Sequence, residues 1–319
     1  MDRPAHDLDR DLGGSPPVDS SAFPLGNNEE RLVERSRLHL QVPKELLKLN
    51  ELDVLYDDDL QTLWTYMHPA GRPSFNRAML NDFETWQRLI SANFGPDKVP
   101  LRFLVLGSRA PGVFCFGGDL ELFQRLIREG NRRALREYGY RCVEILFRNL
   151  HSLDLPILTV GLVEGAALGG GFEALLSFDY IVAERGATFG LPEIMFGLFP
   201  GMGAHALLSR KLGSAMADRL IISNETYTAE QMYEMGIVHR LAEPGEGITA
   251  CRDFIMKSER KHAGLVAARK AMKISSALAL DELKRIVDLW AQTALKLREQ
   301  DLKVMSRLAA AQARVAHAA

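Results

Sequence analysis

The sequence predicts an α/β fold in which helices pack on a mostly parallel sheet, followed by a C-terminal region that is almost entirely helical. Two observations predict this class. Short apolar runs typical of buried strands alternate with amphipathic stretches up to about residue 202, and a β-α-β-α order favours parallel strands joined by crossover helices. Beyond that point strand signals nearly vanish and helical periodicity dominates.

The sequence divides into three predicted segments. Residues 1–35 are expected to be a disordered tail, because the first 30 are acidic and rich in Pro, Gly and Ser and lack the features of a secretory signal. Residues 36–202 are the predicted α/β core, and residues 203–319 are the predicted helical region.

The predicted elements of the core follow one another without long gaps. Two strands over 52–56 and 60–67 flank Asp57-Asp58-Asp59 and read as a hairpin. An amphipathic helix is predicted over 76–92. The alternation continues with strands over 101–106, 155–163 and 180–183 and a long helical region over 120–149.

The C-terminal region offers one good strand candidate, 237–241, among several helices. Its last helix is expected to be long, because an apolar stripe runs from Leu283 through Trp290 to Leu308. A helix with such a face packs on its own core or on a neighbouring subunit.

Composition excludes several classes of function. The 319 residues are 47% hydrophobic, with a formal net charge of −2, so no overall basic field exists for binding nucleic acid. No stretch is apolar and long enough to span a bilayer. The three cysteines are far apart and the eight histidines are scattered, so we expect no metal site, no cofactor and a reducing cytoplasm.

Two glycine-rich loops stand at predicted strand-to-helix junctions, GAALGGGFE over 165–173 and FGGD over 116–119. Glycine lets the backbone approach a ligand and leaves the first helical N–H groups free to stabilise negative charge. A phosphate or the oxyanion of a thioester carbonyl could use them. The sequence matches neither phosphate-binding glycine motif and has no GxSxG, which weakens the phosphate and serine-nucleophile interpretations. Asp119 could simply cap the next helix.

Two glutamates, Glu173 and Glu193, fall in apolar surroundings. Burying an ionised carboxylate is costly unless it is paired or its pKa rises, and a raised pKa suits a carboxylate to proton transfer. The alternative carries equal weight: Glu173 complements its helix dipole and Glu193 caps a neighbouring helix.

As an ordered set, these motifs resemble the crotonase superfamily of enoyl-CoA hydratases and isomerases. The resemblance is carried by GGDLELF, VEGAALGGGFE, ATFGLPEIMFGLFPGMGA and AEQMYEMGIVHRL, and it runs from about residue 52 to 241. It implies a core of ββα repeats and a helical trimerisation region, with a homotrimer or a dimer of trimers. It also implies an oxyanion hole from the backbone N–H groups of Gly118 and Gly170, with Glu173 and Glu193 as the acid positions.

Within the superfamily, FGGDLELF, GGGFEALLS, LPEIMFGLFPGMGA and VDLWAQTALKL are most similar to the diffusible signal factor synthases of bacterial quorum sensing. That likeness implies dehydration of a 3-hydroxyacyl chain on acyl carrier protein to the cis-2-enoyl thioester, then hydrolysis to the free acid. Glu193 would take the Cα proton and Glu173 would protonate the departing hydroxyl, or the reverse. A sensor kinase partner is suggested by the resemblance alone.

Two other functions stay open at this point. The protein could be an ordinary enoyl-CoA hydratase or isomerase acting on acyl-CoA. It could also be a non-catalytic crotonase-fold module that binds a signalling partner, although the presence of both glutamates and both glycine loops speaks against this.

An acyl tail needs an apolar pocket, and the candidate lining residues are Leu168, Leu198, Met202 and Trp290, each with ordinary core packing as the alternative. A docking face for an acidic carrier protein is suggested by seven arginines, Arg125, Arg128, Arg132, Arg133, Arg136, Arg141 and Arg148. A run of mixed charge is more often a solvated helix surface. Glu164, also near the loop, is taken as structural.

Overall fold

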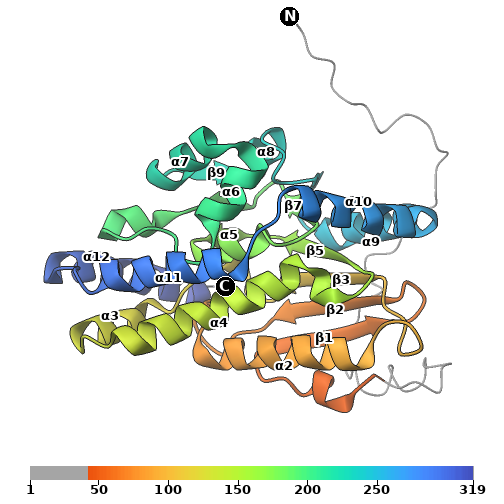
Figure 1. Ribbon diagram of the computed structural model, residues 1–319, viewed down its shortest axis with the longest axis horizontal. Helices are drawn as coiled ribbons and strands as arrows, with labels where there is room; N and C mark the ends of the chain where they lie inside the picture. The colour runs from red at the N-terminus through yellow and green to blue at the C-terminus, as the bar shows by residue number, and fades with distance from the viewer. Residues whose placement is uncertain (1–41, 319) are drawn as a thin grey trace, which may run out of the picture.

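The computed structural model describes residues 42–318, and the predicted tail over 1–35 lies outside this range. A six-stranded sheet runs through the centre of the molecule in the order β1-β2-β3-β5-β7-β10 (Figure 1). Its strands are β1 (Leu52–Asp57), β2 (Thr62–Met67), β3 (Phe103–Ser108), β5 (Leu158–Val163), β7 (Tyr180–Glu184) and β10 (Arg240–Ala242). Only β1 is antiparallel to its neighbour, pairing Leu52 with Met67. The predicted hairpin and the mostly parallel sheet are therefore confirmed.

A second, four-stranded sheet has the order β4-β6-β8-β9. Its strands are β4 (Val113–Cys115), β6 (Ala166–Leu168), β8 (Thr188–Gly190) and β9 (Thr226–Thr228). Each of β4, β6 and β8 follows a strand of the large sheet and precedes a helical segment, namely α3 (Leu120–Arg128), α5 (Gly170–Leu175) and the 3₁₀ helix η4 (Pro192–Phe196). This is the repeated ββα core that the resemblance implies.

Helices cover both faces of the large sheet, as Figure 1 shows. On one face lie α2 (Arg77–Asn93), α4 (Arg132–Leu150) and α5, whose Trp86, Leu146 and Leu175 share a buried cluster with Leu63 and Leu104 of the sheet. On the other face lie α9 (Gly247–Ser258) and α10 (His262–Ser275). Because both faces are covered, every residue of β2 and β5 is buried.

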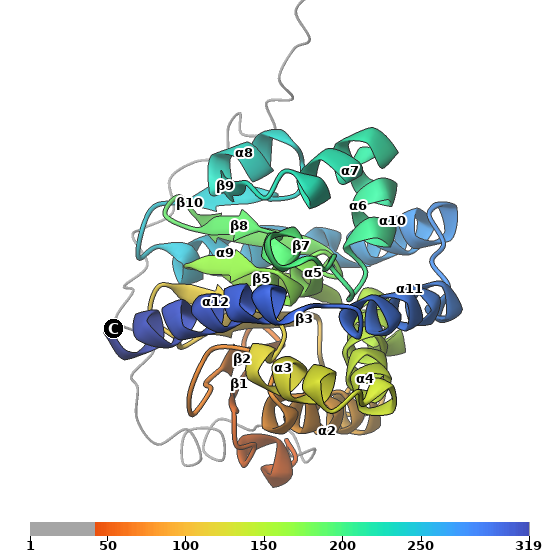
Figure 2. The same cartoon turned by 90° about the vertical axis from the view of Figure 1, so that its left-hand side faces the viewer.

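The C-terminal region is mainly helical, as predicted. It contains α6 (Ala204–Leu212), α7 (Ser214–Ile222), α8 (Ala229–Glu234), α11 (Leu280–Ala294) and α12 (Glu299–Ala318). In Figure 2, α11 lies beside α4, and α12 crosses beside α3. Short 3₁₀ helices complete the described chain: η2 (Lys44–Leu47), η3 (Ser152–Asp154) and η5 (Glu259–Lys261). No helix in residues 42–318 is long and apolar enough to cross a membrane.

Three boundaries differ from the sequence predictions. The helical region over 120–149 is two helices, because Gly130 takes a positive φ of 62° and the Asn131 side chain caps α4 by accepting from the N–H of Ala134. The long final helix is also two, since the carboxylate of Asp301 accepts the N–H of Arg298 and starts α12 afresh. The predicted strand over 237–241 is β10, displaced to Arg240–Ala242. The four strands of the second sheet, β4, β6, β8 and β9, were not predicted as strands.

Candidate active site

The two glycine loops meet in space. A Cβ built on Gly117 would lie 2.4 Å from the backbone N of Gly170, and one built on Gly170 would lie 3.5 Å from the backbone N of Gly118. Among the hydrogen bonds of the described residues, none uses the N–H of Gly118 or Gly170. Two free amide donors therefore lie side by side at the starts of α3 and α5, as an oxyanion hole requires.

Each glycine of the triplet in GAALGGGFE makes a contact that a side chain would prevent. Gly169 has a positive φ of 52°, and a Cβ on it would lie 2.6 Å from Oε1 of Glu193. A Cβ on Gly170 would lie 2.5 Å from Sδ of Met202, and one on Gly171 would lie 2.2 Å from the backbone oxygen of Cys115. The three glycines thus let α5 start against β4 and η4 without steric conflict.

Glu173 lies in the first turn of α5 and is buried. Its Oε1 accepts the backbone N–H groups of Met202 at 2.8 Å and Ala204 at 2.9 Å, at the start of α6. Burial raises the pKa of the Glu173 carboxyl, while the backbone donors of Ala204, Met202 and Gly203 oppose the rise. Glu173 therefore lies in the first turn of its own helix, as the structural alternative expects, and it also caps α6.

Glu193 lies in η4 and has a different environment. Its Oε2 is buried and has no hydrogen-bond partner, so the alternative in which Glu193 caps a neighbouring helix finds no support. Burial first, and then the nearby charge of Glu173, raise the pKa of Glu193 above its ordinary value. The two carboxyls are close enough to interact, and both titrate well above their ordinary value of 4.5.

One cavity of about 600 Å³, part of it open to solvent, brings these groups together. Gly118, Gly170, Glu173 and Glu193 all line it. Leu198, Met202 and Trp290, which the sequence suggested for the acyl pocket, line it as well. Leu168 does not appear in this lining; it lies on β6 opposite Gly190.

The sequence did not predict several of the residues that line this cavity. Tyr138 on α4 accepts the N–H of Asp119 at 3.3 Å and donates to the backbone oxygen of Phe75 at 2.6 Å, so its hydroxyl holds the first glycine loop. Leu308 and Gln312 come from α12, more than 100 residues away in the sequence. No local motif points to either contribution, since both depend on how distant helices pack.

Asp119 caps the next helix, the role that the sequence allowed for it. Its side chain accepts the N–H of Leu122 and caps α3, and its carboxylate pairs with Arg72 at 3.1 Å. Within residues 42–318, no group of three or more His, Cys, Asp or Glu side chains could hold a metal ion.

The run of arginines on α3 and α4 is largely neutralised within the chain. Four of the seven pair with acidic side chains, as Arg128–Glu299, Arg133–Glu137, Arg136–Asp288 and Arg141–Glu84. This pattern is typical of a solvated helix surface of mixed charge, and it weakens the argument for a carrier-protein docking face there.

Comparisons with known proteins agree with the geometry. The family model described as enoyl-CoA hydratase/isomerase matches residues 89–304. The enoyl-CoA isomerase/hydratase fer4 of Mycosarcoma maydis is 30% identical over 232 residues, covering 70% of this chain and 80% of the relative.

Two solved structures share the fold at lower identity. The enoyl-CoA hydratase from Bacillus halodurans superposes with a TM-score of 0.68 at 20% identity, covering 81% of this chain and 100% of the other. DspI of Pseudomonas aeruginosa gives a TM-score of 0.59 at 23% identity, covering 80% of this chain and 98% of the other. With the fold, the paired loops and the family match in agreement, this chain belongs to the enoyl-CoA hydratase/isomerase family, within the crotonase superfamily.

Proposed function

We propose that the protein is a diffusible signal factor synthase. It dehydrates a 3-hydroxyacyl chain on acyl carrier protein to the cis-2-enoyl thioester and then hydrolyses the thioester, which releases a cis-2-unsaturated fatty acid. The observation that carries the proton chemistry is the pair Glu173 and Glu193, two interacting carboxyls that line one cavity with the amides of Gly118 and Gly170.

The glycine cradle binds the thioester carbonyl oxygen. The N–H groups of Gly118 and Gly170 stabilise the negative charge that grows on this oxygen when the Cα proton leaves. One such donor in an enzyme of this kind contributes about 3 kcal/mol, roughly a hundredfold in rate. The same two donors stabilise the tetrahedral intermediate of hydrolysis.

In the dehydration, Glu193 takes the Cα proton and Glu173 donates a proton to the departing hydroxyl, which leaves as water. Glu193 is the stronger base because no donor stabilises its Oε2, whereas two backbone N–H groups hold Oε1 of Glu173 and make it the better acid. The step starts with the proton on Glu173 and with Glu193 ionised.

In the hydrolysis, one glutamate takes a proton from water while the oxygen of that water attacks the thioester carbonyl. The C–S bond then breaks and the carrier thiol leaves with the proton. The mechanism therefore uses no serine or cysteine nucleophile.

The choice of the synthase over other members of the family rests on the sequence resemblance. The segments that carry it supply cavity residues: PEIMFGLFPGMGA contains Glu193, Leu198 and Met202, and VDLWAQTALKL contains Trp290. Acyl carrier protein as the carrier, a trimer or dimer of trimers, and a sensor kinase partner belong to the same proposal.

An ordinary enoyl-CoA hydratase or isomerase is the second candidate. It is favoured by the names of the relatives, which are enoyl-CoA hydratases or isomerases. Such an enzyme would use the same cradle and glutamates on acyl-CoA but would not cleave the thioester.

Product analysis separates the two. The protein is incubated with 3-hydroxydodecanoyl carrier protein, and the products are identified by mass spectrometry and chromatography against cis and trans standards. The proposal expects free cis-2-dodecenoic acid. A trans-2-enoyl chain that stays on its carrier would support the ordinary hydratase instead.

A further inference from the structure

The two amides of the oxyanion hole are held in different ways. The N–H of Gly170 belongs to the same peptide unit as the backbone oxygen of Gly169, and this oxygen accepts the N–H of Glu173 at 3.0 Å. Helix α5 therefore fixes its own donor through its first hydrogen bond. The N–H of Gly118 lies before α3, which begins at Leu120, so no helical hydrogen bond fixes its direction.

A distant segment of the chain holds the peptide unit that contains the Gly118 N–H. This N–H and the backbone oxygen of Gly117 point in opposite directions, because a trans peptide unit is planar. The Gly117 oxygen accepts the N–H of Phe75 at 2.7 Å, and Phe75 and Gly118 form an isolated parallel bridge. The bond from Phe75 therefore sets the direction in which the Gly118 N–H points.

The hydroxyl of Tyr138 takes the place of the second bond of this bridge. In a parallel pair, the N–H of Asp119 would donate directly to the backbone oxygen of Phe75. Here the N–H of Asp119 donates to Tyr138 Oη at 3.3 Å, and Tyr138 Oη donates to the Phe75 oxygen at 2.6 Å. The hydrogen bonds of the described residues include no direct bond between Asp119 N and Phe75 O. The tyrosine hydroxyl thus holds the peptide unit that follows Gly118.

Gly118 depends on both bonds because it is a glycine. Its backbone has a wide choice of φ and ψ, and no side chain could restrict it, since a Cβ on Gly118 would lie 2.6 Å from the ring of Phe123. The peptide unit before Gly118 is held by Phe75, and the unit after it is held by Tyr138. Loss of either bond would let the N–H of Gly118 turn away from a bound thioester oxygen.

Tyr138 is itself firmly placed. It is buried, and its ring packs edge-on against Phe123 with 5.0 Å between the ring centroids. The next residue, Gly139, lies so close to α11 that a Cβ on it would be 2.5 Å from Val287. Burial raises the pKa of the Tyr138 hydroxyl well above its ordinary value. The hydroxyl therefore keeps its proton and remains a donor to Phe75.

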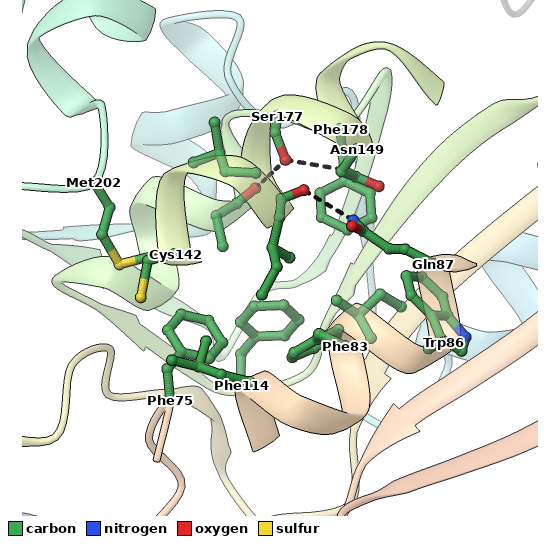
Figure 3. Close-up of a pocket in the computed structure, with 15 residues that line it drawn as sticks. Phe75, Phe83, Trp86, Gln87, Phe114, Cys142, Asn149, Ser177, Phe178 and Met202 are labelled. Atoms are coloured by element: carbon green, nitrogen blue, oxygen red, sulfur yellow. Dashed lines mark hydrogen bonds between the residues drawn. The ribbon is translucent and has the colours of Figure 1, made fainter. Parts of the chain in front are cut away.

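Phe75, the other end of this arrangement, is anchored in the core. It is buried and lines an apolar cavity of about 510 Å³. Its ring packs edge-on against Phe83 of α2, with 6.1 Å between the centroids, and Figure 3 shows it on the same side of the cavity as Phe114 of β4. The backbone groups of Phe75 that hold the glycine loop are therefore fixed by packing.

We propose that Tyr138 is a positioning residue for the oxyanion hole, whose hydroxyl keeps the N–H of Gly118 directed at the thioester oxygen. Negative charge on this oxygen grows only as the transition state forms, so loss of the hydroxyl should slow turnover more than it weakens binding. The inference rests on the proposed role of the Gly118 N–H. The synthase and the ordinary hydratase share that role.

The variant Tyr138→Phe keeps the ring and removes the hydroxyl. Steady-state kinetics are measured with 3-hydroxydodecanoyl carrier protein or 3-hydroxydodecanoyl-CoA, whichever the wild type turns over faster. The kcat is expected to fall roughly tenfold, since a misdirected donor costs less than the roughly hundredfold of a missing one. The KM should change by less than about twofold. A loss confined to KM would contradict the proposal.

The matched control is Tyr56→Phe. Tyr56 lies on β1, is buried, and donates to the backbone oxygen of Pro100 at 2.6 Å, and it does not line the active-site cavity. Both variants lose one bond from a tyrosine hydroxyl to a backbone oxygen, so urea unfolding should show similar losses of stability. Only Tyr138→Phe should lose activity. A folded Tyr138→Phe with the wild-type kcat, or equal losses of kcat in the two variants, would overturn the proposal.

Infrared spectroscopy reports on the oxyanion hole without turnover. Dodecanoyl-CoA labelled with ¹³C at the carbonyl is bound to each protein, and the label separates its C=O band from the protein bands. In the wild type the band should lie at lower frequency than in free dodecanoyl-CoA, because the two amides polarise the carbonyl. Tyr138→Phe should return the band part of the way to the free value, and Tyr56→Phe should not. An unchanged band in Tyr138→Phe would contradict the positioning role.

A crystal structure of the wild type with dodecanoyl-CoA tests the geometry without any variant. The thioester oxygen should accept from the N–H groups of both Gly118 and Gly170, with Tyr138 Oη still bonded to Phe75 and Asp119. A thioester oxygen held by Gly170 alone would overturn the proposal.

These results separate the inference from the proposed function. A lower kcat and a shifted carbonyl band in Tyr138→Phe support the positioning role even if product analysis finds only a trans-2-enoyl thioester. Free cis-2-enoic acid formed by Tyr138→Phe at the wild-type kcat would keep the synthase and reject the role of Tyr138.

Discussion

Glu193 shows how one half-buried side chain, with a buried carboxyl oxygen, sets both the chemistry and the stability of this protein. Its Oε2 has no partner, and its neighbour Glu173 is also acidic. Such an arrangement lowers the stability of the folded state when both groups ionise, and it keeps a proton available near neutral pH. The same environment that suits Glu193 to proton transfer therefore has a measurable cost in folding.

The sign of the pH effect follows from the raised pKa of Glu193. Between its ordinary value of 4.5 and the higher native value, the folded protein binds more protons than the unfolded chain. The free energy of unfolding then falls as the pH rises. The stabilisation that comes from the protonated Glu193 is fully present below the pKa of Glu193 in the unfolded chain. It is lost as the pH rises through the pKa of Glu193 in the folded protein.

We predict that Glu193→Gln, which keeps the shape and cannot ionise, unfolds at a higher temperature than the wild type at pH 9. The difference in unfolding temperature between the variant and the wild type should become smaller on acidification and vanish near pH 4.5. Thermal unfolding followed by circular dichroism across this range measures it, with the exposed Glu45→Gln as the control. A gap of constant size, or a less stable variant at pH 9, would contradict the role given to burial.

At the scale of an element, three glycines with different neighbours lie at the junction between β6 and α5. Gly170 faces the end of a flexible methionine side chain, whereas Gly171 faces the backbone of Cys115 in β4. A side-chain neighbour can move and a paired strand cannot. The two positions should therefore respond differently to the same substitution.

Gly171→Ala is expected to lower the free energy of unfolding by about 2 kcal/mol or more, because its Cβ would overlap the backbone of β4. Gly170→Ala should cost much less stability, since Met202 can swing away, yet it should impair turnover because the displaced thioether crowds the cradle. Urea unfolding and steady-state kinetics on both variants give the comparison. Equal losses of stability would show that the close approach to Cys115 does not matter.

The elements that sequence predicts well are those with local signals. The hairpin of β1 and β2, helix α2 and the strands β3, β5 and β7 follow from apolar periodicity and turn residues. The break between α3 and α4 has a local cause as well, Gly130 followed by the capping Asn131 within the polar stretch 128–133. The four strands of the second sheet have three residues each and are too short to show any periodicity.

The residues of the active site also divide into those with a local sequence signal and those without one. Gly118 and Gly170 lie in short glycine motifs that the sequence predicts at strand-to-helix junctions. Glu173 and Glu193 lie in the first turns of α5 and η4. Tyr138 of α4 and Leu308 and Gln312 of α12 come from separate helices whose side chains meet only after folding. Their spacing in the sequence carries no information about that meeting.

For the whole molecule, the main feature is that the C-terminal helix returns to the active site. Helix α12 packs on α3 and on η4, the segment that holds Glu193. Met305 is fully buried in this contact, and Leu308 and Gln312 line the cavity. The last helix thus closes a site whose reacting groups belong to the α/β core.

Met305→Asp should detach α12 by burying an unpaired charge. Hydrogen exchange followed by mass spectrometry is expected to show faster exchange across α12 and η4, little change in α4, and at least a tenfold drop in activity. Arg307→Asp, on the exposed side of the same helix, is the control and should behave like the wild type. Full activity with α12 detached would show that the site is complete without it.

The central claim is that the cradle activates a thioester and that Glu193 removes its Cα proton. The most direct measurement is deuterium incorporation at Cα of a substrate that lacks a leaving hydroxyl. Dodecanoyl carrier protein is incubated with the enzyme in D₂O, and the mass of its acyl group is measured by mass spectrometry. The account predicts incorporation by the wild type and by Glu173→Gln, and a loss of at least a hundredfold with Glu193→Gln. Exchange at the wild-type rate in Glu193→Gln would contradict it.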